Sequence, residues 1–364
     1  MSSANAQTVE NTHALYLGLF ERTFVAGMPL RINLSLRGEF TEVSTTGLGQ
    51  TPTSLTVQPS DHTAYAVTFG PVAMITAHNS YQSLLPSLDL ALDLTDSWQL
   101  RFDVSRTMTP PPLNAISPVL SMGTIQRVGS LVANGGNPRL TPYDSVNLDL
   151  SLAWFYGPNS YLSVNAFSKE VSNFIVQGSA RQTINGVIDP STGLPAIFTV
   201  TTSVNGPAAG IYGAEFAIQH MFGDTGFGVQ ANATLVDTNK PYNPRNLAVS
   251  GFAVTGLADS ANIVGFYEKG AFQARLALNW RDQYLDHFGQ PQNNSRFGTE
   301  PTFVNTVMQL DFSTSYALNR QLDLYASALN LTDATFSTHG RFSEQLLDAV
   351  DYGRRVTVGL RFNY

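Results

Sequence analysis

The sequence contains no cysteine, few charged residues and no surplus of basic residues. Without cysteine, its 364 residues can form neither a disulfide framework nor a thiolate metal site. Charged residues make up 13% of the chain, which is about half of their usual share in soluble domains. The formal net charge of −7 excludes the basic surface that binds phosphate backbones, so we expect no nucleic-acid partner.

Long apolar runs and a signal peptide are also missing. No stretch approaches the roughly 18 consecutive apolar residues that cross a bilayer as an α-helix, so a helical membrane protein is excluded. The opening residues, MSSANAQTVENTHALYL, have neither the basic segment nor the apolar segment of a secretory signal peptide. We therefore expect either a cytosolic protein or a chain whose natural start is not Met1.

Motifs for catalysis and metal binding are absent as well. The sequence has no nucleophile elbow, glycine-rich phosphate loop, HExxH motif or EF-hand calcium loop. Its six histidines are scattered without the spacing of metal ligands; they are His13, His62, His78, His220, His287 and His339. We therefore expect a protein that is not an enzyme and has no cofactor and no metal site.

What the sequence does contain is strict alternation of apolar and polar residues. In the segment 30–37, LRINLSLR, leucine or isoleucine occupies every even position and a polar side chain every odd one. This period of two is typical of β-strands that have a different environment on each face. The pattern recurs and predicts about 13 strands, at 12–24, 30–43, 70–94, 98–108, 142–156, 161–176, 209–222, 227–237, 258–267, 271–285, 303–316, 321–331 and 351–364.

The connections between these strands alternate between short and long. Short turns are expected at 25–29, 95–97, 157–160, 223–226, 268–270 and 318–320. The long connections are rich in Pro, Gly, Asn and Ser and are expected to be structureless; they span 44–67, 109–141, 177–208, 237–257, 286–302 and 332–350. Such loops argue against a compact soluble domain, whereas outer-membrane barrels have short periplasmic turns and long extracellular loops.

We therefore predict an all-β fold, a transmembrane, antiparallel, up-and-down β-barrel. Bacterial single-chain barrels have an even number of strands. The odd count predicts an incomplete barrel whose amino-terminal part lies outside this sequence. Residues 1–11 would be a disordered or truncated start, and the barrel part would span 12–364.

Aromatic residues collect near the predicted short turns. Because Trp and Tyr gather where hydrocarbon meets water, they predict a periplasmic aromatic girdle that comprises Trp98, Tyr156, Tyr161, Phe222, Phe227, Phe266, Tyr267, Phe272 and Tyr316. Two cations at apolar positions, Arg106 and Arg354, fall near the opposite rim, where they can reach head-group phosphates. The alternative is that aromatic residues near hairpin turns pack over the edge of a soluble sandwich.

Several segments also resemble those of a known family. They include LLPSLDLALDLTDSWQLRFDVSRTMTPPPLNAISP (84–118), NPRLTPYDSVNLDLSLAW (137–154), GIYGAEFAIQ (210–219) and LYASALNLTD (324–333). In this order, and over about 12–364, the chain resembles TonB-dependent outer-membrane receptors, particularly the group common in sphingomonads, caulobacters and xanthomonads.

The resemblance implies more than the residues alone. Such receptors have a 22-stranded barrel plugged by an amino-terminal domain, so this chain would supply about 13 of the 22 strands and no plug. The implied function is uptake of a scarce siderophore, vitamin or oligosaccharide, energised by the TonB complex. It also implies that the last strand carries a signal for the barrel-assembly machinery, at Val356, Val358, Leu360, Phe362 and Tyr364.

Ligand recognition is expected from the long loops and the upper wall of the lumen. Candidates on the strands point into the lumen by parity, and candidates in the loop GQPQNNSRFG (289–298) offer amides that suit hydroxyl-rich ligands. They are Tyr143, Arg275, Asn279, Arg281, Gln292, Asn293 and Asn294. The alternative is that inward charges only keep the wall hydrated and hold the plug.

These expectations place the protein in the outer membrane of a Gram-negative bacterium. Its partners would be lipid and lipopolysaccharide, the barrel-assembly machinery, a small-molecule nutrient and, only through a missing plug, the TonB complex. Two alternatives stay open. One is a self-contained, passive, porin-like channel of about 14 strands, which requires an even strand count. The other is a secreted soluble β-sandwich or adhesin, which would be extracted without detergent.

Overall fold

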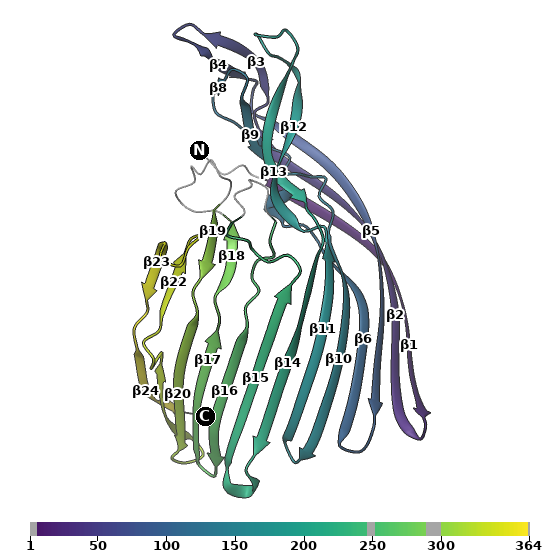
Figure 1. Cartoon of the computed structure of the whole chain (residues 1–364), viewed down its shortest axis with the longest axis vertical. Helices are drawn as coiled ribbons and strands as arrows, with labels where there is room; N and C mark the ends of the chain where they lie inside the picture. The colour runs from purple at the N-terminus through teal and green to yellow at the C-terminus, as the bar shows by residue number, and fades with distance from the viewer. Residues whose placement is uncertain (1–5, 246–251, 289–299, 363–364) are drawn as a thin grey trace.

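The protein is described from a computed structural model that covers residues 6–245, 252–288 and 300–362. Its main element is an antiparallel sheet of 13 strands in which consecutive strands lie side by side (Figure 1). The strands are β1 (Ala6–Val25), β2 (Met28–Gly49), β5 (Ala73–Asp93), β6 (Trp98–Thr109), β10 (Tyr143–Gly157), β11 (Ser160–Ser172), β14 (Ala209–Met221), β15 (Phe227–Thr238), β16 (Ser260–Lys269), β17 (Phe272–Arg281), β20 (Val307–Ala317), β21 (Leu322–Leu329) and β24 (Arg355–Phe362). Within the described residues, no helix is long and apolar enough to cross a membrane.

The predicted number, order and direction of the main strands are confirmed, but several boundaries differ. β1 starts at Ala6, inside the segment 1–11 that was expected to be disordered, because β2 continues to Gly49 and offers backbone groups to pair with. The register runs without interruption from Val25↔Met28 to Ala6↔Gly47. Backbone pairing does not need apolar alternation, so this extension has no signal in the sequence.

The long connections are not structureless, which corrects a second expectation. They contain three smaller sheets, with strand orders β12-β13-β9-β7, β18-β19-β22-β23 and β3-β4-β8. These strands are β3 (Pro52–Gln58), β4 (Asp61–Phe69), β7 (Leu120–Ser121), β8 (Ile125–Arg127), β9 (Leu131–Gly135), β12 (Ile175–Ile188), β13 (Pro195–Asn205), β18 (Tyr284–Phe288), β19 (Pro301–Val304), β22 (Thr335–His339) and β23 (Leu346–Asp351). All of them lie beyond one end of the main sheet, opposite the short turns (Figure 1).

Two of the small sheets pack into an upper lobe, which we define as β3, β4, β7, β8, β9, β12 and β13 (Figure 1). Tyr65 and Phe198 are fully buried at its centre, with 0% exposure each. The Tyr65 hydroxyl donates a hydrogen bond of 2.6 Å to Asp189. This bond, with others from Ser191, holds the pKa of the Asp189 carboxyl below its usual value. Three separate connections thus share one hydrophobic core.

The main sheet has an apolar face and a polar face, because side chains alternate along each strand and register aligns them across strands. The apolar face contains cross-strand rows of leucine, valine and isoleucine, such as Leu34, Leu88, Val104 and Leu148, and Ile263, Leu278 and Leu310. The polar face contains Arg31, Asp89, Asp103, Asn165, Glu215, Asn232, Asn262, Asn279 and Gln309.

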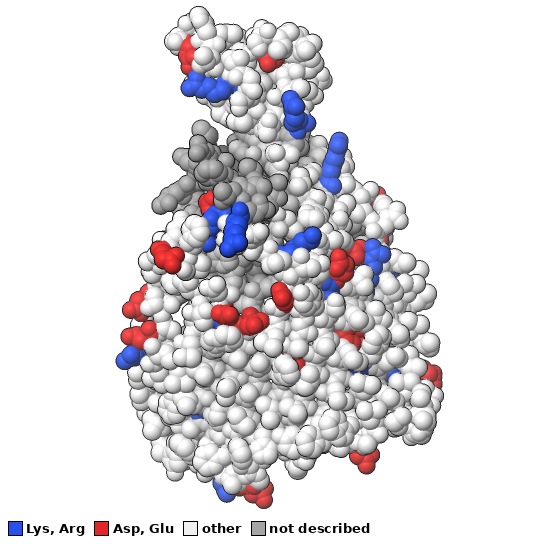
Figure 2. Space-filling model, viewed as in Figure 1, with Lys and Arg blue, Asp and Glu red and all other residues white. Residues whose placement is uncertain are grey.

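None of the residues that the structure describes covers the apolar face. Leu34 is 47% exposed and Leu148 is 44% exposed, although both are large hydrophobic residues in the middle of strands. Figure 2 shows a broad zone with few charged side chains over the lower part of the sheet, below the charged groups near the long connections. So large an apolar surface is unusual for a protein in water.

The sheet has two edges, β1 and β24. No pairing joins these two strands in the ranges that the structure describes. The described strands therefore form an open, curved sheet (Figure 1).

Candidate functional site

The polar face carries an internal hydrogen-bond network between neighbouring strands. The hydroxyl oxygens of Ser35 and Ser87 are hydrogen-bonded at 2.6 Å. The Asn165 amide donates to Glu215 at 3.2 Å, and the Arg31 guanidinium donates to Asp93 at 3.1 Å. These contacts leave the Arg31 Nε and the Asn165 Oδ1 without a hydrogen-bond partner among the described residues. A face so rich in polar groups is suited to water and polar ligands.

Four carboxamides form a single row on this face, which we call the amide row: Asn232, Asn262, Asn279 and Gln309. They come from the adjacent strands β15, β16, β17 and β20 and are paired in register, Asn232↔Asn262, Asn262↔Asn279 and Asn279↔Gln309. The Asn262 amide donates to Asn232 at 2.9 Å. Residues in such register have side chains about 5 Å apart.

Each charged neighbour of the amide row already has a partner within the protein. Gln309 donates to the two carboxylate oxygens of Asp311 at 2.9 and 3.1 Å. The guanidinium carbon of Arg281 lies 4.7 Å from the ring centre of Tyr284. One acid and one base therefore flank the row, and the charges balance locally.

The predicted ligand residues lie on three parts of the structure. Asn279 and Arg281 are two residues apart on β17, at the long-connection end, whereas Arg275 pairs with Phe266 and Ser313 nearer the short turns. Tyr143 is on β10, with its ring centre 6.0 Å from that of Phe174. The structure therefore brings Asn279 and Arg281 together but not Tyr143 or Arg275. Gln292, Asn293 and Asn294 lie outside the described residues.

Tyr143 lines a shallow hollow on the polar face at the long-connection end. Other residues of the hollow include Thr107, Asn147 and Lys169. The Asn147 amide donates to the Thr107 hydroxyl at 3.1 Å. Met108 and Val171 add apolar groups to the lining. The hollow extends over β6, β10 and β11, so β14 separates it from the amide row, which begins on β15.

Asn232, Asn262 and Gln309 were not among the residues predicted from the sequence. Asn262 could have been found, because the tight turn between β16 and β17 pairs Lys269 with Phe272 and thereby sets Asn262 opposite Asn279. Asn232 and Gln309 are separated from these strands by long connections, which leave the register undetermined in the sequence.

Arg341, in the connection between β21 and β24, forms hydrogen bonds with residues of two other long connections, β15–β16 and β17–β20. Its guanidinium donates to both oxygens of Glu300, at 3.0 and 3.2 Å, and to the Pro244 carbonyl at 2.8 Å. It also lies 5.9 Å from the ring centre of Tyr242. Its side chain is only 9% exposed, and the hydrogen bond to Glu300 raises the pKa of Arg341. The positions of these connections are therefore coupled.

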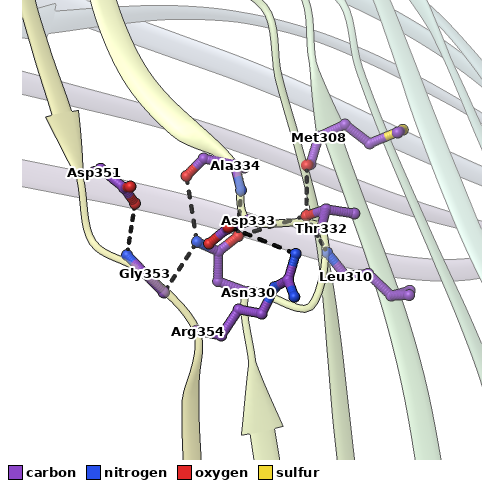
Figure 3. Close-up of polar contacts among 9 residues, drawn as sticks. All are labelled: Met308, Leu310, Asn330, Thr332, Asp333, Ala334, Asp351, Gly353 and Arg354. Atoms are coloured by element: carbon purple, nitrogen blue, oxygen red, sulfur yellow. Dashed lines mark hydrogen bonds and ion pairs between the residues drawn. The ribbon is translucent and has the colours of Figure 1, made fainter.

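A cluster of hydrogen bonds around Asn330 joins the end of β21 to the start of β24 (Figure 3). Asn330 is 7% exposed and has φ of 57°. Its amide nitrogen donates to the carbonyls of Ala334 and Gly353, each at 3.2 Å, and its carbonyl oxygen accepts from the Ala334 N–H at 2.8 Å. Thr332 donates to the Met308 carbonyl at 3.0 Å and so reaches β20.

The aromatic residues near the short turns form chains on the apolar face. Trp98 stacks on Trp154 with ring centres 5.4 Å apart, and Trp154 lies 4.7 Å from Tyr156. A second chain joins Phe227, Tyr267 and Phe272, with spacings of 4.7 and 5.8 Å. Phe222 joins the first chain through His220, whose ring contacts both Phe222 and Tyr156. Tyr316 joins the second chain, because it is opposite Phe272 in the strand register.

Two girdle candidates lie on the other face. The ring centre of Tyr161 lies 6.2 Å from that of Phe155, and Tyr161 is opposite Gln219 in the strand register. Phe266 is opposite Gly228 on one side and Arg275 on the other. Both positions belong to the polar face by register. Both residues are close to a short turn in the sequence, but their parity puts them on the polar face.

The four described positions of the predicted assembly signal share one face of β24. Val356, Val358, Leu360 and Phe362 belong to the apolar face, and their exposures are 70%, 68%, 64% and 56%. Tyr364 lies outside the described residues.

Comparison with known proteins identifies the family. A sequence profile described as "TonB dependent receptor-like, beta-barrel" matches residues 2–331, which is most of the chain. The chain belongs to the TonB-dependent receptor family. Members of this family are transport receptors of the Gram-negative outer membrane, and their barrels have the all-β, antiparallel architecture described above.

Solved TonB-dependent receptors share the fold at low sequence identity. The siderophore receptor PirA from Acinetobacter baumannii is 13% identical, with 99% of this chain and 55% of that chain covered and a TM-score of 0.61. The ferric-catecholate import receptor Fiu from E. coli K12 is 12% identical, with 99% and 46% covered and a TM-score of 0.62. The ferric yersiniabactin receptor FyuA from Yersinia pestis is 15% identical, with 99% and 46% covered and a TM-score of 0.57.

This TonB-dependent receptor chain thus spans about half the length of these structures, 46% to 55%. A search of curated proteins returned no match.

Proposed function

We propose that the chain forms the carboxyl-terminal part of an outer-membrane receptor barrel that takes up a scarce nutrient with energy from the TonB complex. The observation that carries this proposal is the uncovered apolar face of a sheet that belongs to the TonB-dependent receptor family. The apolar face would contact lipid and lipopolysaccharide, and the polar face would line the lumen.

The height of the apolar face supports this orientation. On β5 the apolar positions run from Leu84 to Leu92. At about 3.4 Å per residue and a tilt of about 40°, this run is roughly 21 Å tall, close to the ~25 Å apolar band of outer-membrane barrels. The aromatic chains would then mark the periplasmic interface, and the small sheets would be extracellular.

The nutrient would be a siderophore, a vitamin or an oligosaccharide. Structurally similar receptors named above are described as receptors for siderophores and ferric catecholates. Coupling to TonB would use a plug domain of the whole protein. The apolar positions of β24 would serve as the signal for the barrel-assembly machinery.

Gene disruption in the source bacterium tests the proposal. We expect strains lacking this gene or the tonB gene to share a growth defect when one nutrient, iron, cobalamin or carbon, is limiting. An immunoblot should find the protein in the outer membrane. A defect that does not depend on tonB would instead indicate a passive channel, and a protein extracted by carbonate without detergent would exclude a membrane barrel.

A further inference from the structure

We propose that the amide row holds a neutral, hydroxyl-rich ligand of the oligosaccharide type. This inference deepens the proposed function and rests on it, because it names the class of nutrient that the polar face would bind. It follows from the geometry, the unused hydrogen-bond capacity, the local charge and the position of Asn232, Asn262, Asn279 and Gln309.

The geometry gives the row a defined length. Its four residues occupy consecutive strands in direct register. Three strand spacings of about 4.8 Å make the row roughly 14 Å long. Gln219 and Gln230 extend the amide-rich surface toward β14, where the Gln230 amide donates to Gln219 at 2.8 Å. The surface is therefore long enough to contact several groups of one extended molecule.

Most of the hydrogen-bond capacity of the row is unused. A carboxamide has two donor hydrogens and two acceptor lone pairs, side by side in one plane. Asn262 and Asn232 use one donor and one acceptor between them. Asn279 is exposed, and its side chain has no hydrogen bond to the described residues. Paired donors and acceptors match hydroxyl groups on neighbouring carbons, since each hydroxyl both donates and accepts.

The local charge favours a neutral ligand. In the register rows on either side of the amide row, strands β15, β16, β17 and β20 contribute one acid, Asp311, and one base, Arg281. Asp311 accepts from Gln309 and from the backbone N–H of Asn330, and Arg281 lies against Tyr284. These two charges give no net positive charge that would attract an anionic chelate. A neutral molecule has no charge whose hydration would be lost on binding.

The row is also close to the end of the sheet where a ligand would enter. Asn262 is two residues from the start of β16, Asn279 is two residues from the end of β17, and Gln309 is two residues from the start of β20. All three strand ends lead into long connections. The row thus lies near the end of the main sheet beyond which the small sheets lie (Figure 1).

The test compares outer-membrane vesicles from the source bacterium with and without this gene on an array of immobilised neutral and anionic glycans. We expect gene-dependent binding to neutral glycans. Replacing two carboxamides together, Asn262→Ala with Asn279→Ala, should weaken it at least tenfold, because two hydrogen bonds are lost. Asn279→Gln keeps the carboxamide and should retain most of the binding.

Asn33→Ala is the matched control. Asn33 is an asparagine on the polar face, but it lies on β2, which is distant from the amide row in the sheet order. We expect its binding to equal that of the unchanged protein, and an immunoblot of the vesicles checks the amount of each variant. Equal binding by the double variant, binding only to anionic glycans, or no gene-dependent binding would each overturn the proposal.

The outcomes also separate this inference from the proposed function. If gene disruption abolishes TonB-dependent uptake of a ferric chelate while neutral glycans show no gene-dependent binding, the receptor function stands and the ligand class is wrong. If the immunoblot finds no protein in the outer membrane, both proposals fail.

Discussion

At the scale of single residues, Asn330 combines an unusual backbone angle with a fully used side chain. Its φ of 57° lies in the left-handed region, which asparagine tolerates better than most residues. Its amide joins the two ends of the connection between β21 and β24 through Ala334 and Gly353. The same residue therefore shapes the turn and holds the last strand in place.

We predict that Asn330→Ala lowers the free energy of unfolding by about 2 to 4 kcal/mol, because backbone groups lose their partners and alanine must adopt a positive φ. Asn330→Gly is the matched variant, since glycine accepts this φ and loses only the hydrogen bonds, so its loss should be smaller. Urea unfolding in lipid vesicles measures both. Equal losses for the two variants would show that the backbone angle contributes nothing.

Tyr65 and Asp189 give a pH-dependent prediction for the upper lobe. The hydrogen bond from Tyr65 lowers the pKa of Asp189 in the folded protein. A lowered pKa stabilises the fold above the ordinary pKa of about 3.9, and this stabilisation disappears as the pH falls through the lowered value. In Tyr65→Phe, the pKa of Asp189 should therefore rise toward its ordinary value. Carboxyl NMR titration measures it, and an unchanged pKa would contradict the assignment.

At the scale of strands, the polar face contains three aspartates in direct register, Asp89, Asp103 and Asp149, on β5, β6 and β10. None of them forms an ion pair within the part of the chain that the structure describes. Like charges directly opposite each other destabilise a sheet. This row therefore weakens the strands that carry it unless a cation faces it.

We expect Asp103→Asn to stabilise the described sheet by about 0.2 to 1 kcal/mol, because it removes the central charge. Asp93→Asn is the matched control on the same face. Asp93 accepts hydrogen bonds from Arg31 and Gln99, so its replacement should destabilise. Urea unfolding distinguishes the two signs. A loss of stability in Asp103→Asn would show that a cation pairs with the row.

Strands of the main sheet could be predicted because each one carries its own alternation, as Phe272 to Arg281 does. The strands of the long connections could not, although β13 also alternates buried and exposed residues from Ala196 to Thr202. Its neighbours are β12 and the parallel strand β9, which is distant in the sequence. Such pairings depend on tertiary packing and not on local composition, so Pro, Gly and Ser in these segments suggested loops.

The candidate site was predictable only in part for the same reason. By register, Asn279 and Arg281 lie on the polar face, and one tight turn fixes Asn262 beside Asn279. The rest of the amide row depends on register across long connections. Parity gives only the face of a residue: Tyr143 lies on the same face but strands away on β10, and Arg275 lies four residues from Asn279 along β17, toward the short turns.

At the scale of the whole molecule, the sheet is a curved surface with a different solvent expected on each face. The described strands leave two edges, β1 and β24, whose backbone groups need partners in a membrane. The chain spans about half the length of the similar receptors. A membrane barrel requires that the apolar face contacts lipid and the polar face contacts water.

Cysteine scanning of β17 tests this claim most directly, because the chain contains no cysteine of its own. Single variants Leu276→Cys, Ala277→Cys, Leu278→Cys and Asn279→Cys would carry a spin label in outer membranes. Accessibility to oxygen reports lipid, and accessibility to a polar nickel complex reports water. We expect oxygen accessibility to peak at 276 and 278 and nickel accessibility at 277 and 279. Nickel accessibility at all four positions would contradict the membrane barrel.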